Sequence, residues 1–178
     1  NIIAAGGNDV IYGGGNRDRV DAGSGDDYVE MGDGDHYPFQ DDAGTWVDRG
    51  VYGGAGNDQI VGGPRQIYMR GGDGDDLFVL HPANSSWSRF DGGNGRDTLS
   101  FQRFEAGVTV ALDAPYYDPA NTGNWHTILG NQHFVNMENL KGSQYADTLT
   151  GDDGDNFIYG LGGDDLIDGG LGVDIAVF

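Results

Sequence analysis

The sequence has no cysteine among its 178 residues, which excludes disulfide bonds and thiolate metal sites. Basic residues are also scarce: nine Lys and Arg stand against 29 Asp and Glu, for a formal net charge of −20. This imbalance disfavours nucleic acid and anionic membranes as partners. We find neither a secretory signal nor an apolar run long enough to span a bilayer. The length fits one domain.

Glycine and acidic residues are abundant, and the 34 glycines with so much charge would by themselves suggest disorder. The order of these residues argues against disorder, because they keep a strict period. Residues 71–79 have the form G-G-x-G-x-D-x-U-x, in which U is a large apolar residue. Glycine permits positive φ and leaves carbonyl oxygens uncovered, and hard cations such as Ca²⁺ prefer carboxylate and carbonyl oxygens. The pattern predicts an oxygen-lined loop followed by a short strand.

One nonapeptide cannot enclose a metal, but two of them make a complete coil with a loop on each side. Stacked coils pair as parallel strands about 4.8 Å apart, so a cation midway between two loops lies roughly 2.4 Å along the axis from each. We therefore expect a metal between each loop and the loop 18 residues later, with the sixth-position Asp of both as ligands. Without a cation such carboxylates repel by up to about 4 kcal/mol per close pair, which couples metal binding to folding.

The repeats divide the chain into three parts. A first array covers residues 1–100 and is degenerate at 31–52, 62–70 and 80–91. Residues 101–141 leave the pattern and form a strand-rich linker or cap, and a second array covers 142–178. The chain opens inside one repeat and stops just after another, so we expect it to be a piece of a longer protein.

The candidate metal ligands are the sixth-position side chains of the repeats and the glycine carbonyls of the same loops. The side chains are Asp9, Asp18, Asp27, Asp58, Asp76, Asp97, Asp147, Asn156, Asp165 and Asp174. The carbonyls are those of Gly54, Gly56, Gly72, Gly74, Gly93, Gly95, Gly163, Gly170 and Gly172. Pairing the loops gives about five to eight bound ions.

The spacing also predicts which loops pair. Asp58, Asp76 and Asp97 fall on one side of the coil, and Asp9 with Asp27 on the opposite side. In the second array Asp147 pairs with Asp165, and Asn156 with Asp174 makes a weaker site because the amide is neutral. The pairing of Asp18 with His36 predicts a poor site, because imidazole is a poor ligand for a hard cation. Residues 62–70 carry Arg65 and Ile67 in place of the loop Gly and Asp, so they predict coil geometry without metal.

Other functions remain open on the sequence alone. Five aromatic residues in departures from the repeat could stack on sugar rings or pack against the scaffold: Trp46, Trp87, Tyr116, Tyr117 and Trp125. A hydrolytic site in residues 101–141 and assembly into a layer are further alternatives. No G-x-S-x-G or H-E-x-x-H motif occurs, and we predict that this chain has no active site.

The tandem nonapeptides resemble the RTX (repeats-in-toxin) calcium-binding family over about two thirds of the chain. The segments FEAGVTVALDA, NMENLKGS and ADTLTGD look like a linker that recurs between repeat blocks of large bacterial RTX proteins. The resemblance implies an all-β fold, a right-handed parallel β-roll that is disordered without calcium and folded with it.

The same resemblance implies a secreted, extracellular or cell-surface location, with export by a type I system. The partners it implies are several Ca²⁺ ions and the remainder of a larger protein, such as a protease, toxin, adhesin or S-layer protein. A polysaccharide or cell surface is the alternative partner. Because relatives attach these repeats to many activities, the repeats do not identify the activity of the larger protein.

Overall fold

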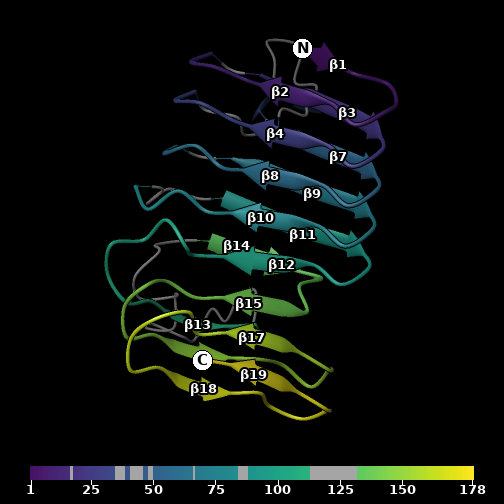
Figure 1. The fold of residues 1–178 in the computed structure, drawn as a ribbon. Helices are drawn as coiled ribbons and strands as arrows, with labels where there is room; N and C mark the ends of the chain where they lie inside the picture. The colour runs from purple at the N-terminus through teal and green to yellow at the C-terminus, as the bar shows by residue number, and fades with distance from the viewer. Residues whose placement is uncertain are drawn as a thin grey trace.

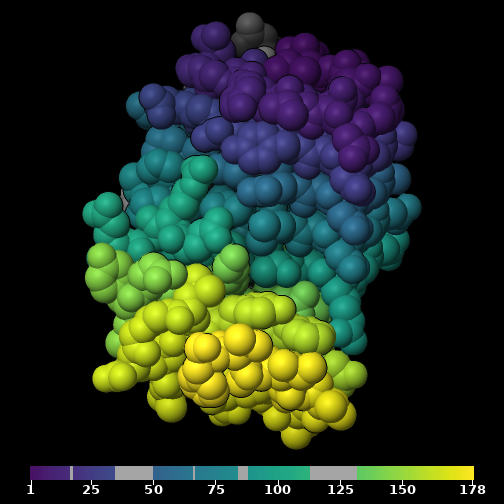
Figure 2. All heavy atoms as spheres, in the orientation of Figure 1, coloured from purple at the N-terminus to yellow at the C-terminus, as the bar shows by residue number. Residues whose placement is uncertain are grey.

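The computed structural model describes residues 1–16, 18–34, 39–40, 46–47, 50–65, 67–83, 88–112 and 132–178. Its regular elements are short strands, and no helix occurs in these ranges. Consequently none of the described residues forms a helix able to cross a membrane. The backbone advances along one axis from the first residue to the last (Figure 1), and the bands of colour in Figure 2 show each part of the chain stacked on the part before it.

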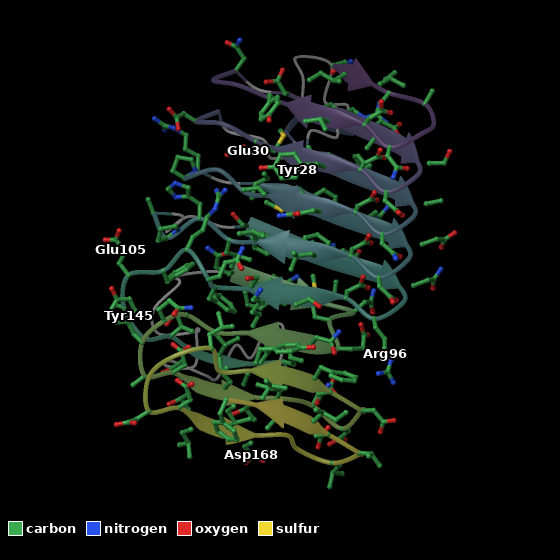
Figure 3. The ribbon with its side chains drawn as sticks, in the orientation of Figure 1. Tyr28, Glu30, Arg96, Glu105, Tyr145 and Asp168 are labelled. Atoms are coloured by element: carbon green, nitrogen blue, oxygen red, sulfur yellow. The ribbon has the colours of Figure 1, made fainter. Side chains whose placement is uncertain are left out.

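One face of the molecule is a continuous eight-stranded parallel sheet. Its strands, in spatial order, are β2 (Val10–Tyr12), β4 (Tyr28–Glu30), β8 (Gln59–Val61), β10 (Leu77–Val79), β12 (Thr98–Ser100), β15 (Asn139–Lys141), β17 (Phe157–Tyr159) and β19 (Ile175–Val177). Each of these strands except β15 follows a glycine-rich loop directly. Tyr28 and Glu30 flank the inward Val29 of β4 and project outward, where the Tyr28 hydroxyl donates to Glu30 at 3.0 Å (Figure 3).

Strands of two further parallel sheets alternate with these along the chain. The six-stranded sheet contains β1 (Ile2–Ile3), β3 (Val20–Ser24), β7 (Val51–Ala55), β9 (Tyr68–Asp73), β11 (Ser88–Asn94) and β14 (Gln132–Val135). The three-stranded sheet contains β13 (Thr109–Ala111), β16 (Thr148–Thr150) and β18 (Leu166–Asp168). A separate antiparallel pair joins β5 (Phe39–Gln40) to β6 (Trp46–Val47). The architecture is the parallel β-roll that the repeats predict.

The apolar residue at the eighth repeat position fills the interior. Strands present alternate side chains to opposite faces, so a single inward residue per three-residue strand suffices. Ile60, Phe78 and Leu99 are fully buried on the eight-stranded sheet, and Met69 and Phe90 are fully buried opposite them, all in one hydrophobic cluster. Each such side chain contributes about 1.5–3 kcal/mol relative to an exposed one. This axial column of apolar side chains holds the short strands together.

Departures from the nonapeptide do not break the stack. Phe78 pairs with Ile60 18 residues earlier and with Leu99 21 residues later, so the extra residues between β10 and β11 leave the register unchanged. Residues 62–70 adopt coil geometry as predicted: β9 pairs with β7 and with β11. The described strands on either side of this departure therefore keep their places in the sheets.

The described parts of residues 101–141 contain strands, as the strand-rich linker or cap predicts. These strands are β13, β14 and β15. Strand β15 pairs with β12 before it and β17 after it, so the eight-stranded sheet is unbroken. On the other side β14 pairs with β11 whereas β13 pairs with β16, and the sheet divides between them.

Glycine is required where successive loops touch. Gly72 has φ of 128°, and a Cβ placed on it would collide with the carbonyl oxygen of Gly54 in the preceding coil. Gly93 meets the carbonyl of Gly72 in the same way. The second glycine of these repeats thus sets how closely the coils can stack.

We predict that Gly72→Ala lowers the stability of the calcium-loaded protein. An L-residue in left-handed backbone costs about 1–2 kcal/mol, and the collision adds to that cost. Thermal unfolding should show a fall in Tm of about 4 °C or more. Gly15→Ala is the matched control, because its Cβ would meet nothing within 4 Å, and its Tm should stay within about 1 °C. Equal effects of the two changes would refute this explanation of the stacking.

Candidate metal centre

A column of five aspartates runs along the eight-stranded sheet, one immediately before each of its first five strands. The members of this aspartate column are Asp9, Asp27, Asp58, Asp76 and Asp97. In each successive pair the Oδ1 atom of the later aspartate accepts the backbone N–H of the earlier one, at 2.8, 2.9, 2.8 and 2.9 Å. Every carboxylate therefore fixes the loop of the coil before it.

The second oxygen of these carboxylates has a different environment. The Oδ2 atoms of all five members are buried and have no hydrogen-bond donor among the residues that the structure describes. Asp27, Asp58, Asp76 and Asp97 are themselves at most 3% exposed. A buried carboxylate oxygen without a partner is costly, so a cation that reached it would be strongly favoured.

Asp9 and Asp27 are adjacent as expected, but the side of the coil assigned to them from the sequence is wrong. Asp9 and Asp27 were expected on the opposite side from Asp58, Asp76 and Asp97, but β4 pairs with β8 and all five precede strands of the same sheet. Counting in nines places Asp27 and Asp58 on opposite sides of the coil. Because the stretch between β4 and β7 is not a multiple of nine residues long, this count fails, and both aspartates precede strands of the eight-stranded sheet.

The unpartnered Oδ2 atoms of Asp58, Asp76 and Asp97 face the first glycine of their own repeats. A Cβ on Gly53 would overlap Oδ2 of Asp58 and would lie 2.8 Å from the carbonyl oxygen of Gly71 in the next coil. A Cβ on Gly71 would likewise overlap Oδ2 of Asp76, with the carbonyl oxygen of Gly92 at 2.6 Å. A carboxylate from one coil and a carbonyl from the next thus converge on a space that only glycine leaves open.

The predicted carbonyl donors occupy a neighbouring position. The second-position glycines Gly54, Gly72 and Gly93 form one axial column, and the fourth-position glycines Gly56, Gly74 and Gly95 form another. The carbonyls of Gly71 and Gly92, which approach the Oδ2 atoms, belong to the first position and were not among the predicted donors. The sequence did not indicate that these carbonyls lie near the carboxylates, because a glycine at the first position is equally consistent with a turn alone.

A second ladder of side chains runs outside the first and in the opposite direction. At the fifth repeat position, the side chain of each residue accepts a hydrogen bond from the backbone N–H of the fifth residue in the next coil. The acceptor–donor pairs are Asn8–Asp26 at 3.1 Å, Asp26–Asn57 at 2.9 Å, Asn57–Asp75 at 2.8 Å and Asp75–Arg96 at 2.9 Å. Here the earlier coil supplies the acceptor, whereas in the aspartate column the later coil does. Each loop is therefore tied to both of its neighbours. Asn57 also separates the charges of Asp26 and Asp75.

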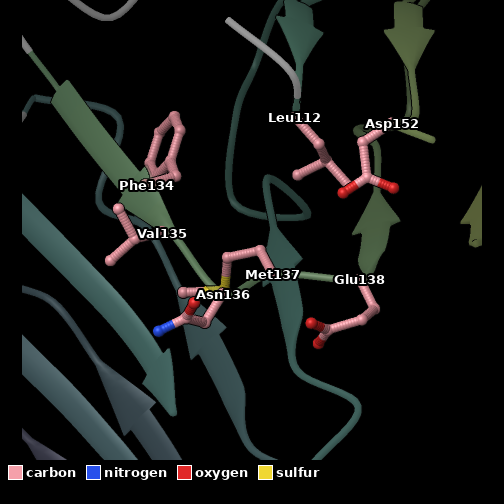
Figure 4. A pocket seen from close by; sticks show the side chains of 7 residues that line it. All are labelled: Leu112, Phe134, Val135, Asn136, Met137, Glu138 and Asp152. Atoms are coloured by element: carbon pink, nitrogen blue, oxygen red, sulfur yellow. The ribbon is translucent and has the colours of Figure 1, made fainter. Parts of the chain in front are cut away.

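Glu138 extends the aspartate column and was missed in the sequence. Its Oε2 atom accepts the N–H of Asp97 at 2.8 Å, the contact that an aspartate makes in the coils before it. Asn136 occupies the place of the fourth glycine, with φ of 54°, a conformation that asparagine tolerates. Both residues border a cleft between β14 and the end of β13 (Figure 4). The sequence signal for Glu138 was an acidic residue two positions after Asn136. It was missed because this repeat has lost its glycines.

The second array differs in how its sixth-position groups are satisfied. Asp147 accepts the N–H of Val108 at 2.7 Å and both the N–H and the hydroxyl of Ser143, at 2.6 and 2.8 Å. Asn156 accepts the N–H of Asp152 at 2.9 Å and donates to the Glu138 carbonyl at 2.7 Å.

The predicted pairs of this array are nonetheless adjacent. The N–H of Asp147 donates to Oδ1 of Asp165, and the N–H of Asn156 donates to Oδ1 of Asp174, both at 2.9 Å. Gly170 and Gly172 contact the carbonyls of Asp152 and Gly154 in the coil before. Gly163 instead contacts the backbone around Ala146.

Several predicted residues lie apart from the aspartate column. Asp18 precedes β3 of the six-stranded sheet. His36, Trp87, Tyr116, Tyr117 and Trp125 fall outside the described residues, as does the side chain of Trp46. Across the described ranges no cluster of three or more His, Cys, Asp or Glu side chains occurs. A cation at the aspartate column would therefore depend on main-chain carbonyls as well as carboxylates, which suits a hard cation.

Burial changes the acidity of the central column. It raises the pKa of Asp76 to about 7 and the pKa values of Asp58 and Asp97 to about 6, and neighbouring carboxylates raise them further. The backbone N–H bond to each Oδ1 atom acts in the opposite direction without cancelling the effect. Protons and cations should therefore compete for these oxygens near neutral pH.

Short parallel strands wound into one coil, with oxygen-rich loops in axial register, define a β-roll built of calcium-binding nonapeptides. The family model of the RTX calcium-binding nonapeptide repeat matches four copies, over residues 1–35, 51–64 and 141–176. The chain therefore carries repeats of this family, and these repeats support a calcium-binding module. The aspartate column continues through Asp76 and Asp97, beyond the matched residues. No curated protein matches the chain.

We predict opposite pH dependences with and without calcium. In a chelator, the pKa of Asp76 near 7, against 3.8 for an ordinary aspartate, favours folding below about pH 4, and this contribution is lost as the pH rises through about 7. With calcium the ionised carboxylate is needed, so the calcium concentration for half-folding should rise as the pH falls from about 8 to 5. Circular dichroism at several pH values measures both. A calcium midpoint independent of pH would contradict the raised pKa values.

Proposed function

We propose that this chain is a structural module whose folding is driven by Ca²⁺ bound between successive loops of the aspartate column. The observation that carries the proposal is the row of buried Oδ2 atoms that have no hydrogen-bond donor among the described residues. Those of Asp58, Asp76 and Asp97 each lie near a carbonyl oxygen of the next coil. Calcium would neutralise these carboxylates. The chain provides carboxylate and carbonyl oxygens as ligands, and its glycines leave space beside them.

The proposed ligands follow from the contacts. Oδ2 of Asp58 pairs with the Gly71 carbonyl, and Oδ2 of Asp76 pairs with the Gly92 carbonyl, both within the first array. Asp97 with the Asn136 carbonyl, beside Glu138, extends the series beyond the first array. Asp147 and Asn156 already have hydrogen-bond partners from the chain, and we assign them mainly to holding their loops.

Because neighbouring sites share a coil, filling one should favour the next. A bound ion fixes two loops, and each fixed loop presents half of another site, as in other stacked repeats. Extracellular calcium in the millimolar range would fill weak sites of this kind, whereas cytosolic calcium would not. RTX repeats are typical of secreted bacterial proteins, so we infer that the module belongs to a secreted protein and folds after export.

The test is a calcium titration followed by far-UV circular dichroism. We expect a cooperative gain of β-structure with calcium, reversed by a chelator. Magnesium at the same concentration should produce little, because it demands tighter octahedral geometry and keeps its water. A chain that folds equally well in a chelator at pH 8 would refute the proposal.

A pair of isosteric variants separates the two classes of aspartate. Asp76→Asn keeps an acceptor for the Asp58 N–H but removes the charge, so we expect the calcium midpoint to rise about tenfold and the cooperativity to fall. Asp147→Asn should shift the midpoint less than about threefold while lowering the Tm in saturating calcium, because it disrupts the bonds from Ser143. Equal midpoints for the two variants would refute the proposed division of roles.

A further inference from the structure

The outer face of the six-stranded sheet carries arginine and tyrosine side chains on four consecutive coils. We call this set the arginine–tyrosine column: Arg19, Tyr52, Tyr68, Arg70 and Arg89. Its position follows from the register, because the neighbouring residues Val20, Val51, Met69 and Phe90 are the fully buried ones. Alternation along each strand then places the column on the outside.

The rings and guanidinium groups interleave. Arg19 lies 5.6 Å from the centroid of the Tyr52 ring, and Arg89 lies 5.5 Å from that of Tyr68. Arg70 lies 5.9 Å from both rings, which themselves meet edge to face at 6.3 Å. Contacts at these distances hold the cations in place and lower the entropy lost when a ligand binds.

The column gathers three of only nine Lys and Arg residues in a chain of net charge −20. Their counter-ions are few and distant. Arg70 and Arg89 share the single Oδ2 atom of Asp91, at 3.7 and 3.5 Å, and Arg19 lies 3.8 Å from Asp21. The other oxygen of Asp91 accepts from the Asn136 side chain at 2.9 Å. One nearly buried carboxylate thus faces two guanidinium groups whose side chains are 48% and 44% exposed.

We propose that the arginine–tyrosine column is a docking surface for an anionic polysaccharide. Each guanidinium presents five N–H donors in a fork that matches a carboxylate or sulfate, so most donors of Arg70 and Arg89 remain for a ligand. Tyr52 and Tyr68 offer apolar ring edges to the sugar. The residues form two neighbouring rows across strands about 4.8 Å apart, since Tyr52 is paired with Arg70 and Tyr68 with Arg89. This periodic arrangement suits an extended chain with a charge on each ring.

The charge of the whole molecule selects among polyanions. A chain of net charge −20 repels a densely charged polymer such as nucleic acid more strongly than a polymer with one charge per sugar. Each bound Ca²⁺ adds two positive charges, so docking should strengthen with calcium loading. This last point rests on the proposed calcium-driven folding.

The test is titration calorimetry of the full chain in saturating calcium. The probes are a short uronic-acid oligosaccharide, a sulfated oligosaccharide and a neutral glucose oligosaccharide of equal length. We expect one or both anionic probes to bind and the neutral probe to give no heat. Which anionic probe binds identifies the anion as carboxylate or sulfate. The double variant Arg70→Ala/Arg89→Ala should lose affinity at least tenfold.

Arg103→Ala is the matched control. It removes one exposed positive charge that pairs with Glu30 of the eight-stranded sheet, and its affinity should stay within about twofold of the wild type. Should the double alanine variant not fold, Arg70→Lys/Arg89→Lys keeps the charge without the fork and should still weaken binding severalfold. Absence of binding by the folded wild type, equal binding of the neutral probe, or an equal loss in Arg103→Ala would overturn the inference.

Circular dichroism of the same samples separates the two proposals. Absence of calcium-dependent folding contradicts the proposed function. A protein that folds with calcium and binds no anionic probe contradicts only the docking surface.

Discussion

Buried carboxylate oxygens without hydrogen-bond donors are the constraint on which this structure depends. Asp58, Asp76 and Asp97 must stand close together, because each fixes the loop of the coil before it through its first oxygen. Their second oxygens are buried, and the described part of the chain provides no hydrogen-bond donor for them. The same contacts that align the coils therefore favour a cation, and in the proposed function folding and metal binding become one process.

The rest of the molecule serves this arrangement in different ways on its two sides. The eight-stranded sheet is continuous and carries the aspartate column, extended by Glu138 where the repeat has lost its glycines. The six-stranded sheet has few such loops, and between its coils arginine and tyrosine side chains interleave instead. Apolar side chains such as Phe78 and Phe90 join the two sides in one core. Contacts between successive coils thus involve carboxylates on the eight-stranded sheet and stacked arginine and tyrosine side chains on the six-stranded sheet.

The fold was predictable because the nonapeptide specifies it locally. Glycine positions, the sixth-position aspartate and one apolar residue per strand predicted stacked coils of parallel strands, and the resemblance to the RTX family implied the β-roll. Strand β9 pairs within the sheet although Ile67 replaces the aspartate of its repeat. The side assigned to Asp9 and Asp27 was wrong, because it depended on the length of an irregular segment. Contacts between coils, such as the Ser143 bonds to Asp147 and the Gly71 carbonyl beside Asp58, are tertiary, and no local pattern encodes them.

The most direct measurement is a crystal structure of the calcium-loaded protein, with the ions located by their anomalous scattering. The account predicts peaks within bonding distance of Oδ2 of Asp58, Asp76 and Asp97, each also close to a carbonyl oxygen of the next coil. A structure with the same coil and no ion beside these three oxygens would contradict it.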